Sequence, residues 1–454
     1  MRKATLLYWS LVVIGLALSV WMALHSQVLP DQVNQLRFAW HLIEESEWLP
    51  HGVPTSAGGK TPGGMIAIVT AVPLLLWMDY RAVAVSIVLL NLGAFLLLER
   101  AIRPALGSAG RWLLLLMLWL SPWRMAYASH IWAPNYALPI GMMHLATASA
   151  MRTRRSFWAT LAHVLLIGLG VQIHLGLALL AVLSLLLVIG RVIKMHWGGF
   201  TVGIAVVAAS LVSWLEAAVA DPTILPGGWG FPFRGLVLVA PMLRGFLYVL
   251  RTGSLSLPGR LLHFDFTAAF GADVDQWLAP VATVVSLAAH ATVLVACWAL
   301  WRLVRWGRRV RPWRDRAPGR LRPWLRSYLL LGWTASIITF AVSPTTLMHW
   351  QTLAVLHVAV LTTVLAVEAS LRLRRPRSGR LVVLWSVLTV CLLFFLAFGS
   401  PKYRRGGRDA AVATLTADHP LVDRYRLRDH ATVVIDPDHE WISHDRPPRA
   451  DDRR

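Results

Sequence analysis

The chain has 454 residues, of which 56% are hydrophobic and only 15% are charged. A soluble protein of this size carries about a quarter charged residues, so the composition excludes an ordinary soluble enzyme. The net charge of +21 would suggest a nucleic-acid partner in a soluble protein. Here the cations cluster in short loops between apolar runs, where they fix orientation and meet lipid headgroups. We therefore expect membrane lipids as partners and no nucleic acid.

Repeated apolar runs of about 17–22 residues predict an all-α polytopic membrane protein. The first run follows Met1-Arg2-Lys3 and is expected to be an uncleaved signal anchor. Segment 64–79 is too short for a full crossing, so we interpret it as a re-entrant or interfacial helix, or as the tilted start of the next span. About eleven spans are expected, at 5–24, 81–100, 112–128, 134–151, 157–174, 176–193, 198–219, 279–303, 328–346, 352–371 and 381–399.

The distribution of arginine between these runs predicts the topology. Most basic loops, including the dense block from Arg302 to Arg326, alternate in a way that places them in the cytoplasm together with the N-terminus. The outer, periplasmic side of a bacterial inner membrane would then receive the regions 25–80, 122–133, 220–278 and 400–454. We divide the chain into a transmembrane module at 1–278 with outer loops 25–80 and 220–278, C-terminal transmembrane helices at 279–399, and a small polar tail at 400–454.

Two segments of the outer loops have the pattern of amphipathic helices that lie at the membrane surface. Residues 31–46 place apolar side chains at helical spacing, after a helix start at Pro30 and Asp31. Residues 234–251 place Leu243, Phe246, Leu247 and Leu250 on one face and Arg244 and Arg251 on the other. Two such helices could frame a groove at the surface.

The first outer loop contains two side chains suited to chemistry on an anionic lipid. Asp31 follows the first span, and Lys60 lies 29 positions later in Gly59-Lys60-Thr61-Pro62-Gly63-Gly64. Asp31 could act as a general base on an acceptor, or it could simply cap the following helix. Lys60 could bind a phosphate, or it could be a surface lysine attracted to lipid. The glycines around Lys60 do not have P-loop spacing, so no nucleotide site is expected.

Other polar and aromatic residues lie near the outer ends of the spans. Trp132 could stack on a sugar face and Asn135 could hydrogen-bond a sugar hydroxyl, but from the sequence alone an interfacial aromatic belt followed by a helix start is the simpler interpretation. His174 could bind phosphate or be a structural histidine, and His349 is a weaker candidate of the same kind. The sequence shows no cluster of His, Cys, Asp and Glu at ligand spacing, so neither a metal nor another cofactor is expected.

The order and spacing of these residues resemble the GT-C membrane glycosyltransferases, in the branch of protein O-mannosyltransferases and the lipid A aminoarabinose transferase. The family has an acidic pair after the first span, a Lys-Pro-Pro-type motif about 30 residues later, and an arginine that opens the next span. These features match Asp31-Gln32, Gly59-Lys60-Thr61-Pro62 and Arg81, and the resemblance extends over about the first 280 residues. Gln32 and Gly59 depart from acidic residues in the family pattern.

The resemblance implies an enzyme that transfers a hexosyl or pentosyl group from a polyprenyl-phosphate donor to a glycan, lipid or protein acceptor, with inversion and without metal. It makes Asp31 the base. Lys60, with Arg81 or His174, would bind the donor phosphate, and Gln32, Trp132, Asn135 and His349 would contact the sugar or acceptor. Two alternatives remain: a transporter or flippase of lipid-linked glycan, and a non-catalytic relative.

Overall fold

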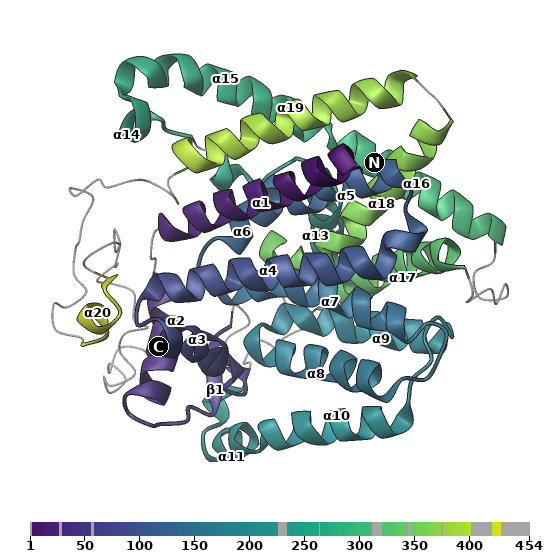
Figure 1. Cartoon of the computed structure of the whole chain (residues 1–454). Coiled ribbons are helices and arrows are strands. Elements are labelled where there is room, and N and C mark those ends of the chain that lie inside the picture. The colour runs from purple at the N-terminus through teal and green to yellow at the C-terminus, as the bar shows by residue number, and fades with distance from the viewer. Residues whose placement is uncertain are drawn as a thin grey trace.

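We describe the protein from a computed structural model, which defines residues 2–26, 30–55, 59–225, 234–262, 264–310, 320–343, 347–373, 376–400 and 420–427. These residues form helices and one antiparallel hairpin (Figure 1). The helices are α1 (Arg2–Leu24), α2 (Pro30–Ile43), α3 (Met65–Leu76), α4 (Tyr80–Ile102), α5 (Ser108–Leu114), α6 (Pro122–Ala128), α7 (Ala137–Ala150), α8 (Phe157–Ile173), α9 (Ala178–Ile189), α10 (Trp197–Ser210), α11 (Val212–Ala220), α12 (Arg234–Leu238), α13 (Ala240–Thr252), α14 (Thr267–Phe270), α15 (Ala272–Ala291), α16 (Val293–Val310), α17 (Leu321–Val342), α18 (Leu356–Arg372), α19 (Pro376–Gly399) and α20 (Leu421–Arg424).

Strands β1 (His51–Pro54) and β2 (Lys60–Pro62) form the hairpin. Short 3-10 or π turns join several helices: η1 (Arg103–Ala105), η2 (Leu115–Trp119), η3 (Ala133–Tyr136), η4 (Leu175–Leu177), η5 (Pro222–Ile224), η6 (Gly259–Leu261) and η7 (His349–Val355).

Helices dominate the described part of the chain, as the apolar runs predict. Seven of its helical stretches are long and apolar enough to cross a membrane, and four shorter apolar helices accompany them. The chain is therefore an all-helical, multi-pass membrane protein. Every predicted span overlaps helical structure among the described residues, while the number of eleven crossings stays a prediction. The seven are Lys3–Leu24, Tyr80–Ala105, Trp197–Ala220, Ala272–Arg308, Leu321–Val342, His349–Arg372 and Ser378–Gly399.

The predicted span 112–128 is not one continuous helix. It ends in the π turn η2 and restarts as α6 at Pro122. Proline forces the preceding Ser121 out of helical conformation, and its missing N–H cannot continue the ladder. The buried guanidinium of Arg124 donates to the freed carbonyl of Trp119 and to Ser19 Oγ at 2.9 Å, which satisfies polar groups in an apolar interior.

Helix α18 runs through the centre of the bundle and is almost wholly buried. Near its C-terminal end, buried Glu368 accepts hydrogen bonds from the Gly107 amide (2.7 Å), Arg322 (2.8 Å) and Arg372 (2.7 Å). This carboxylate joins the starts of α5 and α17 to the end of α18. Its removal would leave partly buried Arg322 and exposed Arg372 without this partner. Helix α5, which packs on α18, lies toward the end of the bundle where the chain begins (Figure 1).

The opposite end of the bundle is covered by α2, α3, the hairpin and α20 (Figure 1). Helix α2 matches its predicted amphipathic pattern, because Leu36 and Ala39 are fully buried in a cluster with residues of α3 and α4. Helix α3 has 12 residues, which span about 18 Å and cannot cross a bilayer core of about 30 Å. A short helix is thus present in segment 64–79, while its interpretation as a re-entrant or interfacial helix, or as the tilted start of the next span, stays a prediction.

Part of the polar tail folds back onto α2. Tyr425 is buried against Trp40, with ring centroids 6.0 Å apart, and its carbonyl accepts from the Tyr80 amide at 3.1 Å. Arg424 pairs with Glu44 at 2.8 Å. Residues 420–427 thus lie at the same end of the molecule as the first loop, whereas 401–419 and 428–454 lie outside the described residues.

The second predicted amphipathic helix is α13, and its faces differ from the prediction. Its buried positions are Gly245, Val249, Leu250 and Thr252, while Leu243 and Leu247 are exposed. Helix α13 packs on α17, α18 and η7, and this packing, rather than the sequence spacing, decides which residues turn inward.

Candidate functional site

The Asp31 side chain lies near the start of α2 and is exposed, and Oδ2 accepts a hydrogen bond from the Trp132 indole at 3.1 Å. The indole N–H of Trp132 fixes the orientation of the carboxylate, which stays accessible to solvent. The contact joins two residues that the sequence analysis selected separately. Asp31 thus lies in the first turn of α2, and its carboxylate is oriented by Trp132.

Lys60 opens strand β2, and its Nζ lies 2.8 Å from His51 Nε2 in strand β1. Lys60 and His51 are nine positions apart in the sequence, and the hairpin brings their side chains together. Partial burial lowers the pKa of the Lys60 ammonium, while the carboxylate of Asp221 at the end of α11 opposes that shift. Hydrogen bonds from Thr223 lower the pKa of Asp221, and the charges of Lys60 and His51 lower it further. The arrangement is a pair of basic side chains, Lys60 and His51, with one nearby acid, Asp221.

The hairpin packs on the end of α8 through glycine. Gly63 has a φ of +77°, and a Cβ there would lie 2.3 Å from Gln172 Oε1. This close approach requires glycine. Among the described residues, buried Gln172 Oε1 and His174 Nε2 have no hydrogen-bond partner. Two polar atoms without partners, next to the hairpin that carries Lys60, are able to accept or donate to a polar ligand.

His349 begins η7 and stands inside a cluster of aromatic rings. The ring centroids of Trp350, Tyr248, Tyr127 and Trp123 lie 4.9, 5.7, 6.0 and 6.4 Å from it. Trp132 joins this aromatic cluster, 5.5 Å from Trp350 and 6.2 Å from Tyr127. Helix α2 reaches it through Asp31, and α13 reaches it through Tyr248. Clustered aromatic rings with polar edges suit contacts to a sugar.

These segments contact one another in a closed ring that begins and ends at α2, here called the circuit of contacts. Asp31 binds Trp132, whose ring packs on Trp350 of η7. Turn η7 packs on η4, next to His174, and α8 packs on the hairpin. The circuit returns to α2 because the rings of His51 and Phe38 meet at 6.1 Å. Phe38 lies two helical turns, about 10 Å, beyond Asp31 on the same face of α2.

The remaining predicted residues have more structural partners. Arg81 forms a two-pronged pair with fully buried Asp79, at 2.9 and 2.6 Å, and Asp79 also caps α4. Asn135 is fully buried and donates to the His130 carbonyl at 2.7 Å, leaving its Oδ1 without a partner among the described residues. Gln32 is buried within the packing of α2. These three side chains are fixed in place more firmly than Asp31 or Lys60.

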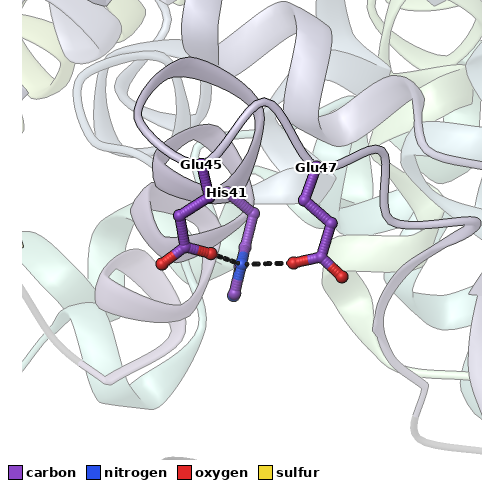
Figure 2. A group of neighbouring side chains, drawn as sticks. All are labelled: His41, Glu45 and Glu47. Carbon is purple, nitrogen blue, oxygen red and sulfur yellow. Dashed lines mark ion pairs between the residues drawn. The ribbon is translucent and has the colours of Figure 1, made fainter.

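One group of potential metal ligands lies near the site, although the sequence analysis expects no such cluster. His41 Nδ1 lies between carboxylate oxygens of Glu45 and Glu47, the second at 3.0 Å (Figure 2). The three residues come together because α2 ends at Ile43 and the chain turns back, with the Glu47 amide bonded to the His41 carbonyl. The contacts pair one imidazole nitrogen with two carboxylates that are both exposed.

Several residues at the site escape sequence reasoning. His51, Tyr127, Tyr248 and Trp350 carry no motif, and they join the site through packing. The position of His51 in a short strand nine residues before Lys60 is the one signal that the sequence offered.

No protein-family model matches the chain, and no curated protein matches it significantly. A solved structure of ArnT from Cupriavidus metallidurans bound to undecaprenyl phosphate is similar over 85% of this chain and 63% of its own, with 16% identity and a TM-score of 0.51. The apo state of the same protein is similar over 79% and 59%, with 15% identity and a TM-score of 0.47. The fold is of the GT-C type. The prediction of that fold is confirmed, and the chain spans about three-fifths of the length of these structures.

Proposed function

We propose that the protein is a membrane glycosyltransferase that moves a hexosyl or pentosyl group from a polyprenyl-phosphate donor to an acceptor, with inversion, on the periplasmic face of a bacterial inner membrane. One observation carries the proposal. In a GT-C fold, the circuit of contacts brings an accessible carboxylate, Asp31, and a partly buried cation, Lys60, to the same end of the bundle. ArnT, the similar protein, binds undecaprenyl phosphate in one of its structures.

The proposed reaction assigns one task to each group. An acceptor hydroxyl or amine attacks the anomeric carbon from the face opposite the phosphate, and Asp31 takes its proton. The bond from the anomeric carbon to the phosphate oxygen breaks, and the electron pair leaves with the phosphate. Lys60 stabilises the charge that grows on this leaving group, with His174 and Arg81 as further donors. No metal or other cofactor enters this scheme.

The aromatic cluster supplies contacts to the sugar or acceptor in this proposal. Trp132 orients Asp31 through its indole N–H and offers a ring face to the sugar, while His349 lies among four rings. Asn135 and Gln32 are the polar groups proposed to complete the recognition. The donor lipid remains in the bilayer while its sugar-phosphate reaches this end of the bundle.

The test is transfer from a radiolabelled polyprenyl-phosphate sugar by the purified protein. Asp31→Asn removes the base and is expected to lower turnover about 10²- to 10⁴-fold with unchanged thermal unfolding. Glu47→Gln, which removes an exposed carboxylate just after the same helix, is the matched control and is expected to keep full turnover. Lipid translocation without transfer would favour a flippase, and tight donor binding without turnover would favour a non-catalytic relative.

A further inference from the structure

The contact between His51 and Lys60 has no task in the proposed reaction, which uses Lys60 alone. The two side chains come from paired strands, and His51 Nε2 lies 2.8 Å from Lys60 Nζ. An ammonium group has three N–H donors and no acceptor, so the imidazole nitrogen has to accept this hydrogen bond. Beside a protonated Lys60, His51 is therefore neutral and carries its proton on Nδ1.

The second ring nitrogen of His51 agrees with this assignment. Nδ1 lies 3.3 Å from the carbonyl oxygen of Gly52, which accepts from an N–H. The bonds that the two nitrogens make decide which of them carries the proton. One neutral form of His51 thus satisfies both contacts, whereas a doubly protonated ring would point an N–H at the ammonium group of Lys60.

His51 is also held by the helix that carries Asp31. Its ring meets the ring of Phe38 edge to face, with centroids 6.1 Å apart, and Phe38 is buried in α2. A lysine side chain is flexible and has four carbons between its backbone and its charge, so a bond to a fixed ring restricts it strongly. The ammonium group of Lys60 is therefore oriented relative to α2 through His51.

We propose that His51 is a positioning residue, which holds the Lys60 ammonium by one N–H and leaves the other two N–H groups for the phosphate of the lipid-linked donor. This role rests on the proposed function, in which Lys60 binds that phosphate. The bond to His51 also favours the charged form of Lys60, because it is accepted from the ammonium. Partial burial acts in the opposite direction and lowers the pKa of Lys60.

Two variants separate the acceptor of His51 from the bulk of its side chain. His51→Leu keeps an apolar side chain against Phe38 and removes the acceptor, and His51→Ala takes its place if it does not fold. His51→Gln supplies an amide oxygen that accepts from Lys60. His290→Leu, at an exposed position of α15, is the matched control for loss of a histidine. Thermal unfolding in detergent establishes that each variant is folded.

The first measurement needs no ligand. An acylating reagent reacts with the neutral amine of lysine, so the rate of Lys60 labelling against pH, read by peptide mass spectrometry, follows its protonation. In His51→Leu the midpoint is expected to move to lower pH, with labelling about tenfold faster below it. His51→Gln and His290→Leu are expected to keep the wild-type midpoint. Lys194, which donates to the Thr153 carbonyl at 2.9 Å, is the internal reference and is expected to stay unchanged.

The other ionisable groups around the hairpin are the same in every variant, so a difference between variants reports on residue 51. The hairpin packs on α2, α3 and α8, and α3 has no ionisable side chain. The groups on α2, on α8 and its cap, and next to α11 are Asp31, Arg37, His41, His163, His174 and Asp221.

The second measurement is binding of a polyprenyl phosphate, followed by tryptophan fluorescence at neutral pH. Affinity is expected to fall about tenfold in His51→Leu and to change little in His51→Gln and His290→Leu. An unchanged labelling midpoint in His51→Leu would overturn the proposal, because His51 would then not hold the ammonium. A shifted midpoint with unchanged affinity, or equal losses of affinity in His51→Leu and His51→Gln, would also overturn it. Absence of binding in the wild-type protein would contradict the proposed function itself and would leave His51 with no phosphate to serve, whatever the labelling profile.

Discussion

At the residue scale, Asp31 and Lys60 are held differently. Asp31 is exposed and receives one indole N–H, whereas Lys60 is partly buried and lies against His51. The sequence predicts both as candidates from their positions near a membrane surface. It could not predict their partners, because Trp132 is 101 residues from Asp31 and meets it only in the folded chain.

Trp132→Phe tests whether the indole N–H orients the base. The phenyl ring keeps the aromatic packing but cannot donate to Asp31, and a hydrogen bond to a charged group contributes about 1.5–3 kcal/mol. Turnover in the transfer assay is expected to fall about tenfold or more. In the Asp31→Asn background the same substitution is expected to cost little further, and additive losses would contradict the orienting role.

The pH dependence tests Lys60. Burial lowers the pKa of its ammonium, so donor affinity is expected to fall on the alkaline side at a pH below the ordinary lysine value of about 10.4. Between the lowered folded pKa and the unfolded pKa, the unfolded chain binds more protons. The contribution of Lys60 to the free energy of unfolding therefore rises with pH in the window where affinity falls.

Lys60→Arg is the control for this pH dependence, because a guanidinium group stays protonated throughout that window. Binding of a polyprenyl phosphate, followed by tryptophan fluorescence at several pH values, is expected to lose its alkaline decline in Lys60→Arg. An unchanged decline would show that another group titrates.

At the scale of elements, hydrophobic periodicity predicts α2 and the long helices well. The periodicity fails to predict the structure where proline interrupts a helix or where packing against a distant segment decides which residues are buried. Pro122 splits the span at 112–128, and the packing of α13 against α17 and η7 turns Leu243 and Leu247 outward. The His41, Glu45 and Glu47 group was missed because a chain reversal after α2, and not helical spacing alone, brings Glu47 back to His41.

The docked tail segment 420–427 is expected to hold α2 in place. Tyr425→Ala removes a fully buried ring from the cluster that contains Leu36 and Tyr80, and a cost of about 3 kcal/mol is expected. Hydrogen exchange is expected to increase in α2, which carries Asp31, while α18 stays protected. Unchanged exchange in α2 would show that the tail only covers this surface.

At the scale of the whole molecule, composition and charge predict a multi-pass helical protein, and the order of short motifs predicts its GT-C fold. The candidate site was predictable only in part. Sequence places Asp31 and Lys60 in the first outer loop and Trp132, His174 and His349 near the outer ends of other spans. Three-dimensional packing connects these segments through His51, Phe38 and Trp350.

The position of the donor phosphate tests the central claim most directly. A cryo-electron microscopy structure of the protein with a non-transferable polyprenyl-phosphate sugar is expected to place a phosphate oxygen about 3 Å from Lys60 Nζ, with the anomeric carbon on the side facing Asp31. A phosphate bound away from the hairpin, with Asp31 and Lys60 on separate surfaces and neither touching the donor, would contradict the account.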